Sequence, residues 1–207
     1  MFTELLIRYP ALHACEDSIL HAFKALTKLY ENGGKLLLCG NGGSASDCDH
    51  IVGELCKGFL NMRPLTEEQR ESMQKNCPSL SSETLLKLQR GLPAISLSTI
   101  PPLNAAFAND VDADLVFAQG VLALAKEGDC LFAITTSGNS KNVLHACRVA
   151  RGLGIKVIGL TGESGGALAE LADVCIRVPE RETYKVQELH LPVYHALCAE
   201  VERYFFE

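Results

Sequence analysis

The sequence lacks the features that would assign it to a membrane, a secretory route or a nucleic acid. No apolar run is long enough to span a bilayer, and the start of the chain, Met1–Glu4, has neither the basic nor the apolar region of a signal peptide. No block of Lys and Arg occurs, and the net charge of −6 argues against a nucleic-acid surface. We therefore expect a cytoplasmic protein that has neither a membrane nor a nucleic acid as a partner.

The cysteines follow no pattern that would indicate disulfides or a zinc cluster. There are nine of them, an odd number, and no two are spaced as Cys-x-x-Cys. Several, including Cys39, Cys130 and Cys175, lie in strand-like runs, where cysteine behaves as a small hydrophobic residue. We expect reduced, buried thiols.

Helix-like and strand-like segments alternate along a chain whose length suits one domain. The 207 residues are 47% hydrophobic and 21% charged, a composition that supports a sizeable core. Mostly continuous apolar runs predict strands buried on both faces at Lys35–Cys39, Ala94–Ser98, Cys130–Thr135, Lys156–Leu160 and Val174–Val178. Helices are predicted at residues 10–32, Ala45–Phe59, Leu115–Ala125, Lys141–Gly152, Gly166–Leu171 and Thr183–Phe205. This order predicts a three-layer α/β fold, with a parallel sheet between two layers of helices.

One polar stretch, Asn61–Arg90, interrupts the alternation. Its segment Thr66–Gln69 resembles a capping box, and Ser82–Arg90 predicts a second short helix. We expect a helical insertion over about residues 60–92, between the helix that follows the first strand and the second strand. A surface elaboration is the favoured role, and a lid over a site is the alternative.

Two similar turns follow two of the predicted strands, and each precedes a helical pattern. The first reads Gly40-Asn41-Gly42-Gly43-Ser44-Ala45-Ser46, and the second reads Thr135-Thr136-Ser137-Gly138-Asn139-Ser140. Small residues let the backbone approach a ligand closely, and the free amides and positive dipole end of a following helix favour an anion. Such turns also occur as plain strand-to-helix connections, but two of them in one chain predict a phosphate site.

Two of the predicted helices carry side chains that could perform chemistry. His50 and Glu54 are four residues apart, so they share one helix face and could bind a metal or a substrate, or simply each other. Gln187 and His195 are eight apart, roughly 12 Å along a regular helix, which is too far for one metal to bind both comfortably. Either Pro192 distorts the helix, or subunits share the site, or only one of the two is a ligand.

In combination, six motifs resemble the sugar isomerase (SIS) domain family, near the phosphoheptose isomerases. The six are Gly40–Asp47, His50-x-x-x-Glu54, Asn109-Asp110, Thr136–Val143, Leu160-Thr161-Gly162, and Gln187-Glu188-x-His190 followed by His195. The resemblance extends over nearly the whole chain outside residues 60–92. It implies one SIS domain over residues 1–207 with a flavodoxin-like five-stranded parallel sheet, assembled as a homotetramer whose active sites lie at subunit contacts.

The resemblance also implies an enzyme, an aldose–ketose isomerase for a seven-carbon sugar phosphate. Sedoheptulose 7-phosphate would be converted into D-glycero-D-manno-heptose 7-phosphate through an enediolate, without a nucleotide cofactor. The implied catalytic pair is Glu54 and His195, as base and acid. The substrate-binding residues implied by the matching motifs are Asn41, Gly42, Gly43, Ser44, Asn109, Asp110, Thr135, Thr136, Ser137, Ser140 and Gln187.

Some members of this family bind zinc, and the resemblance places it on His50, Glu54, Gln187 and His195. Neutral His and Glu suit zinc, whereas Gln is an unusual ligand, so a weakly held or absent metal also fits. The residue types suit the reaction. A carboxylate can abstract the carbon-bound proton, an imidazole can serve the oxygens, and zinc can stabilise the enediolate.

The chain departs from the family pattern after the second predicted strand. Ser98–Pro102 lacks the acidic residue that relatives often carry there, and Val111-Asp112 replaces a Gly and an aromatic residue. Two other functions stay open. A non-catalytic regulator that binds a replication initiator is disfavoured because Glu54 and His195 are both kept, and a sugar-phosphate sensor would bind its ligand without turnover.

Overall fold

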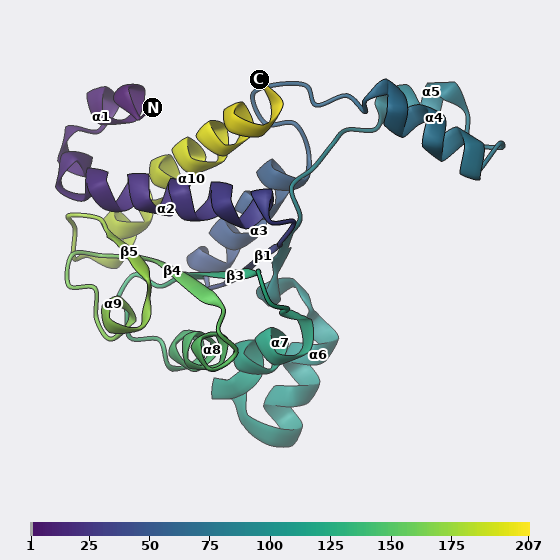
Figure 1. Ribbon diagram of the computed structural model, residues 1–207. Helices are drawn as coiled ribbons and strands as arrows, with labels where there is room; N and C mark the ends of the chain where they lie inside the picture. Colours follow the sequence, from purple (N-terminus) through teal and green to yellow (C-terminus); the bar gives the residue numbers. More distant parts are fainter. Residues whose placement is uncertain (1) are drawn as a thin grey trace.

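The computed structural model describes residues 2–207 and contains one five-stranded sheet (Figure 1). All five strands are parallel, and their order across the sheet is β2-β1-β3-β4-β5. The strands are β1 (Leu36–Cys39), β2 (Ala94–Ser96), β3 (Cys130–Ile134), β4 (Lys156–Thr161) and β5 (Val174–Arg177). This is the strand order of flavodoxin-like folds, and it confirms the predicted parallel α/β architecture.

The central strands are buried on both faces because helices cover the sheet from two sides. On β1, Leu36 and Leu38 pack into the core on one face, whereas Leu37 and Cys39 pack into the core on the other. Successive side chains of a strand point to opposite faces, so both sets must be apolar. This double burial explains why the strands are continuous apolar runs in the sequence.

Long helices form one layer and shorter helices form the other (Figure 1). The first layer contains α2 (Glu16–Glu31), α3 (Gly43–Cys56) and α10 (Thr183–Phe206), with α1 (Thr3–Arg8) beside α10. The second layer contains α6 (Pro101–Phe107), α7 (Val116–Leu124), α8 (Lys141–Gly152) and α9 (Leu168–Leu171). No helix within residues 2–207 is long and apolar enough to cross a membrane.

Two regions differ from the helices predicted from the sequence. The N-terminal helix is divided, because a 3-10 segment, η1 (Pro10–Cys15), precedes α2. After β2 and a short 3-10 turn, η2 (Leu97–Thr99), α6 begins with a proline in its first turn, where the missing N–H costs nothing. The helical path then continues through a π turn, η3 (Ala108–Asp112), and a 3-10 turn, η4 (Ala113–Leu115).

The cysteines are free thiols, as the sequence indicates. All nine lie within the described residues, none forms a disulfide, and six of them are buried. Burial raises the pKa of the Cys15 and Cys175 thiols to about 11, which keeps them protonated and unreactive.

The insertion contains two helices that project away from the sheet (Figure 1). The first, α4 (Glu67–Asn76), begins with the predicted capping box, because Thr66 and Gln69 each accept a backbone hydrogen bond from the other. The second, α5 (Ser82–Lys87), ends three residues before the predicted limit. Its role as a surface elaboration or a lid stays a prediction.

A fully buried ion pair between Arg63 and Glu202 fixes the base of the insertion. Arg63 Nε lies 2.7 Å from Glu202 Oε1, and both side chains are 0% exposed. Arg63 also donates to the carbonyls of Glu54 and Leu55 at the end of α3, and the Glu202 carboxylate accepts from the backbone amides of residues 59–61. Burial alone would raise the pKa of Glu202, but these donors hold it below its ordinary value. The pair therefore joins α3, α10 and the insertion.

We expect Glu202→Gln to lower the free energy of unfolding by about 3–5 kcal/mol, because the change leaves Arg63 buried without its counter-charge. Urea denaturation of the wild type and the variant measures this difference. Glu83→Gln is the matched control, since it removes an exposed pair with Lys87 on α5 and should cost less than about 1 kcal/mol. Equal stability of the two variants would show that the buried pair does not hold these elements together.

Candidate active site

The two glycine- and hydroxyl-containing turns meet at the carboxyl edge of the sheet. They follow β1 and β3, which are neighbours, and β2 and β4 lie on opposite sides of this pair. Such a switch point is where ligands bind in open parallel sheets. Asn41 of the first turn and Asn142 at the start of α8 exchange two side-chain hydrogen bonds of 2.9 Å. The amide pair therefore ties the two turns to each other.

Hydroxyl groups of the second turn lie close to one another. Thr135 Oγ1 is 2.8 Å from Ser140 Oγ and 3.5 Å from Ser137 Oγ. Gly138 has a φ of 68°, and a Cβ on it would overlap the Gly165 carbonyl, so the turn requires glycine here. Ser140 is the N-cap of α8, whose free amides and positive dipole end lie at the turn. This arrangement can bind an anion such as phosphate.

The first turn forms the start of α3 and lies against the last helix. The helix begins at Gly43, and the neighbouring Ser44 is buried. A Cβ on Gly43 would overlap the side-chain amide nitrogen of Gln187, so this side chain of α10 lies directly on the turn. The structure thus brings the predicted substrate residues 41–44 together with Gln187.

Three predicted site residues meet farther along α3 and α10, which run side by side. His50 Nε2 lies 3.1 Å from Glu54 Oε1, which confirms that these two side chains share a helix face. The rings of His50 and His195 are 4.8 Å apart and lie edge to face. Lys57 Nζ lies 3.5 Å from the other carboxylate oxygen, Glu54 Oε2. A carboxylate and an imidazole suited to proton transfer are therefore neighbours within one chain.

His195 lies in the enclosed part of this group. Its Nε2 is buried, without a hydrogen-bond partner in the described part of the chain, and Phe59 packs 5.6 Å from its ring. Burial, followed by the charge of His50, lowers the pKa of His195, and the carboxylate of Glu54 acts in the opposite direction. The imidazole of His195 is therefore neutral near pH 7 and can both donate and accept a proton.

Two residues without a role in the sequence analysis form a series on the opposite side of His50, where Tyr194 contacts the ring and Asp47 contacts Tyr194. The Tyr194 hydroxyl is 3.0 Å from His50 Nδ1 and 3.3 Å from Asp47 Oδ1. Burial raises the pKa of Asp47, although the hydrogen bond from Tyr194 and the charge of His50 limit the rise. The three-residue spacing of Asp47 and His50 was the one sequence signal for this contact. Tyr194 lies 144 positions from His50, so only the fold could pair them.

The donor groups suit zinc chemically, but they do not surround one point. His50 Nε2 and Glu54 Oε1 have a spacing of 3.1 Å, close to that of two ligands that each lie about 2 Å from one tetrahedral zinc. Over residues 2–207, no three His, Cys, Asp or Glu side chains converge into a metal site. The helix α10 continues through Pro192, and Gln187 lies on the first turn while His195 lies beside His50. Of these two predicted ligands, His195 therefore lies beside His50 and Glu54, and Gln187 does not.

Asn109 and Asp110 make no hydrogen bond to the other predicted site residues in the described part of the chain. They lie in η3, both are exposed, and Asn109 Nδ2 donates to Asp110 Oδ1 at 2.8 Å. Neither side chain hydrogen-bonds to either turn among the residues described. Their assignment to the substrate site stays a prediction.

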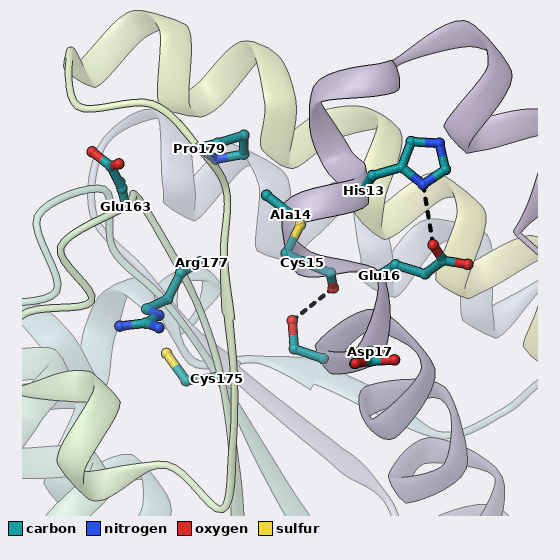
Figure 2. Close-up of a pocket in the computed structure, with 10 residues that line it drawn as sticks. His13, Ala14, Cys15, Glu16, Asp17, Glu163, Cys175, Arg177 and Pro179 are labelled. Atoms are coloured by element: carbon teal, nitrogen blue, oxygen red, sulfur yellow. Dashed lines mark hydrogen bonds and ion pairs between the residues drawn. The ribbon is translucent and has the colours of Figure 1, made fainter.

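Two cavities of similar size lie on the surface. A groove of about 390 Å³ between α1 and α10 is lined by His195 together with Leu60 and Leu191. A cavity of about 410 Å³ lies between the start of α2 and β5, where Arg177 and Cys175 face His13–Ser18 (Figure 2). None of the predicted site residues lines this second cavity. The groove beside His195 is therefore the one relevant to the site.

His190, which shares α10 with these residues, is part of the core. Its side chain is fully buried, and within residues 2–207 neither ring nitrogen has a hydrogen-bond partner. Burial lowers the pKa of His190 to about 4. This residue is therefore a neutral histidine within the core.

The comparisons with known proteins converge on one family. Residues 9–92 and 105–199 each match an SIS domain. The phosphoheptose isomerase of Aliarcobacter butzleri is 38% identical over 187 residues, which cover 90% of this chain and 85% of that protein. The solved phosphoheptose isomerase of Neisseria gonorrhoeae has a TM-score of 0.76 at 31% identity, covering 98% of this chain and 95% of that chain. The solved phosphoheptose isomerase of Francisella tularensis has a TM-score of 0.77 at 34% identity, and the match covers 95% of this chain and 91% of that chain.

We expect acid to destabilise this fold through His190. In the native state its pKa is about 4, whereas in the unfolded chain it lies near 6.5, so the unfolded state binds more protons between these values. The free energy of unfolding should therefore fall as the pH drops from about 6.5 to 4, with a contribution of up to about 1.4 kcal/mol per pH unit. Urea titrations over this range should show a shallower slope for His190→Gln, and a slope equal to that of the wild type would contradict the assignment.

Proposed function

The chain belongs to the phosphoheptose isomerase family of SIS-domain proteins, and on that basis we propose that it interconverts sedoheptulose 7-phosphate and D-glycero-D-manno-heptose 7-phosphate. Membership of this family makes the chain a phosphosugar isomerase. The observation that carries the proposal is the grouping of His50, Glu54 and His195 on two helices, one of which begins at a phosphate-type turn.

The phosphate group of the substrate binds at the second turn in this proposal. The hydroxyls of Thr135, Ser137 and Ser140 lie near the start of α8, where free amides and the helix dipole favour an anion. Thr136 belongs to the same turn. The sugar then extends toward the first turn, where the amide of Gln187 lies over Gly43.

Proton transfer in this proposal uses one carboxylate and one imidazole. In the ketose-to-aldose direction, Glu54 takes a proton from C1 and returns it to C2, so the carbon-bound proton is conserved. His195 protonates the oxygen on C2 and accepts the proton from the oxygen on C1, which its neutral form can do. Lys57 Nζ lies 3.5 Å from the other oxygen of Glu54, Oε2, and leaves Oε1 for the proton transfer.

A zinc ion is part of the proposal, held by His50 and Glu54 with His195 as a third ligand. Support comes from the donor types, the 3.1 Å spacing of the first two donors and the buried, unpartnered Nε2 of His195. The amide of Gln187 would have to leave Gly43 to join this set. When bound, zinc would polarise the carbonyl of the sugar and stabilise the negative charge of the enediolate.

The active protein in this proposal is a homotetramer whose active sites lie at subunit contacts. Leu60 is 66% exposed and Leu191 is 41% exposed, and both line the groove that contains His195. Ile7 on α1 and Met62 beyond the groove are 73% and 77% exposed. Apolar side chains concentrated at such a groove favour burial against another subunit.

Replacing the acid or the base should remove most of the isomerase activity. Because acid–base groups contribute about 100- to 10,000-fold, we expect Glu54→Gln and His195→Asn each to reduce kcat by such a factor. Turnover of sedoheptulose 7-phosphate, measured with zinc added and with zinc chelated, tests this. Glu188→Gln, an exposed carboxylate on α10, is the control. Full activity in both site variants would refute the acid–base assignment, and no turnover by the wild type would favour a regulator or a sensor.

Subunit assembly can be tested at the groove. We expect Leu60→Glu to dissociate the tetramer and to reduce turnover, because a charge would be placed in the subunit contact. Leu86→Glu, which changes a similarly exposed leucine on α5, should leave the assembly intact. Sedimentation velocity reports the mass of each variant, and a Leu60→Glu protein that remains tetrameric would place the contact elsewhere.

A further inference from the structure

Four polar side chains form one hydrogen-bonded series between α3 and α10. The Tyr194 hydroxyl lies 3.3 Å from Asp47 Oδ1 and 3.0 Å from His50 Nδ1. On the other side of the same imidazole, His50 Nε2 lies 3.1 Å from Glu54 Oε1. Tyr194 is 2% exposed, and Asp47 is half-buried with its Oδ2 enclosed, so bulk water has limited access to this end of the series.

The number of available protons limits how the series can be arranged. A carboxylate only accepts, a tyrosine hydroxyl has one proton to donate, and a neutral imidazole carries one N–H. With the proton on His50 Nε2, that nitrogen donates to Glu54, and Tyr194 must donate its proton to Nδ1. The carboxylate of Asp47 then has no donor in the series. With the proton on His50 Nδ1, that nitrogen donates to the Tyr194 oxygen, and Tyr194 donates to Asp47.

The second arrangement is the one that satisfies Asp47. Tyr194 is its only side-chain hydrogen-bond donor among residues 2–207, and its Oδ2 has no partner. A half-buried carboxylate with one enclosed oxygen and no donor is costly, so the environment of Asp47 favours this arrangement. It leaves the lone pair of His50 Nε2 directed at Glu54 Oε1, two acceptors 3.1 Å apart that repel each other unless a second proton or a metal ion lies between them.

We propose that Tyr194 and Asp47 are positioning residues that hold the proton of His50 on Nδ1, so that Nε2 and Glu54 together face a zinc ion. Histidine ligands of metals usually donate their other N–H to a carboxylate, a carbonyl or a water, which fixes the ring and raises its basicity. Here the Tyr194 hydroxyl connects His50 to the carboxylate. This inference rests on the proposed zinc site and is independent of which sugar phosphate the enzyme uses.

The surroundings of the series are compatible with this role. Lys57 lies near Glu54 Oε2 and leaves Oε1 facing His50. The His195 ring lies edge to face against both Tyr194 and His50, at 4.9 and 4.8 Å. Removing one hydroxyl from Tyr194 would preserve these ring contacts, so a phenylalanine variant isolates the hydrogen bonds.

The test measures zinc affinity in the absence of substrate. Protein stripped with a chelator is titrated with zinc in competition with a chromophoric chelator. We expect Tyr194→Phe to weaken zinc binding about 10- to 100-fold, and Asp47→Asn to weaken it in the same direction. Tyr204→Phe removes an exposed hydroxyl that is bonded to Glu31, and it should bind zinc as the wild type does.

A double-mutant cycle separates positioning of His50 from a general effect on packing. Tyr194→Phe is measured again in a protein that already carries His50→Ala. If Tyr194 acts through His50, the second change should cause no further loss of zinc affinity. If Tyr194 contributed only to packing, Tyr194→Phe would weaken zinc binding by the same factor in the wild type and in His50→Ala. Circular dichroism confirms that each variant is folded.

Three results would overturn this proposal: no zinc binding by the wild type, equal affinity of the wild type and Tyr194→Phe, or an equal loss in both backgrounds. Turnover of sedoheptulose 7-phosphate by the same proteins shows whether the positioning role of Tyr194 or the proposed isomerase function has failed. An active enzyme with unchanged zinc affinity in Tyr194→Phe would remove only the positioning role. A Tyr194-dependent zinc site without turnover would remove only the proposed substrate.

Discussion

The packing of α3 against α10, fixed by the buried ion pair of Arg63 and Glu202, is the constraint on which the candidate site depends. The last carbonyls of a helix have no intrahelical donors, and Arg63 supplies donors to those of Glu54 and Leu55. Glu202 binds the amides that follow α3 and belongs to α10 itself. Because Glu54 is on one helix and His195 on the other, this pair, together with the apolar packing of the two helices, holds the carboxylate and the imidazole in place relative to each other.

The candidate site has two parts, one formed mainly by backbone turns and the other by individual side chains. At the sheet edge, tight turns and the starts of α3 and α8 provide amides and hydroxyls that suit a phosphate of any sugar. Farther along α3 and α10 lie the carboxylate and the imidazoles to which the proposed mechanism assigns proton transfer and zinc binding. The first part depends on the topology of the sheet, and the second depends on the register of two helices.

The sequence predicted best those elements that are determined by residues close to one another in the chain. The strand β1 was recognised because burial on both faces makes it a continuous apolar run, and α8 was predicted with both of its observed limits. By contrast, α6 was missed because its paired prolines and low periodicity resemble a loop, although proline is favoured in the first turn of a helix. The contact of Tyr194 with His50 was missed because no periodicity relates residues so far apart.

The sequence by itself determined the alternation of strands and helices, the two phosphate-type turns and the shared face of His50 and Glu54, since each is a property of neighbouring residues. Only the tertiary structure decided which side chains meet across α3 and α10. It placed Gln187 on Gly43, His195 beside His50, and Tyr194 between His50 and Asp47. The physical reason is that such contacts depend on how two helices pack, which is set by buried groups distant in the chain, such as Arg63 and Glu202.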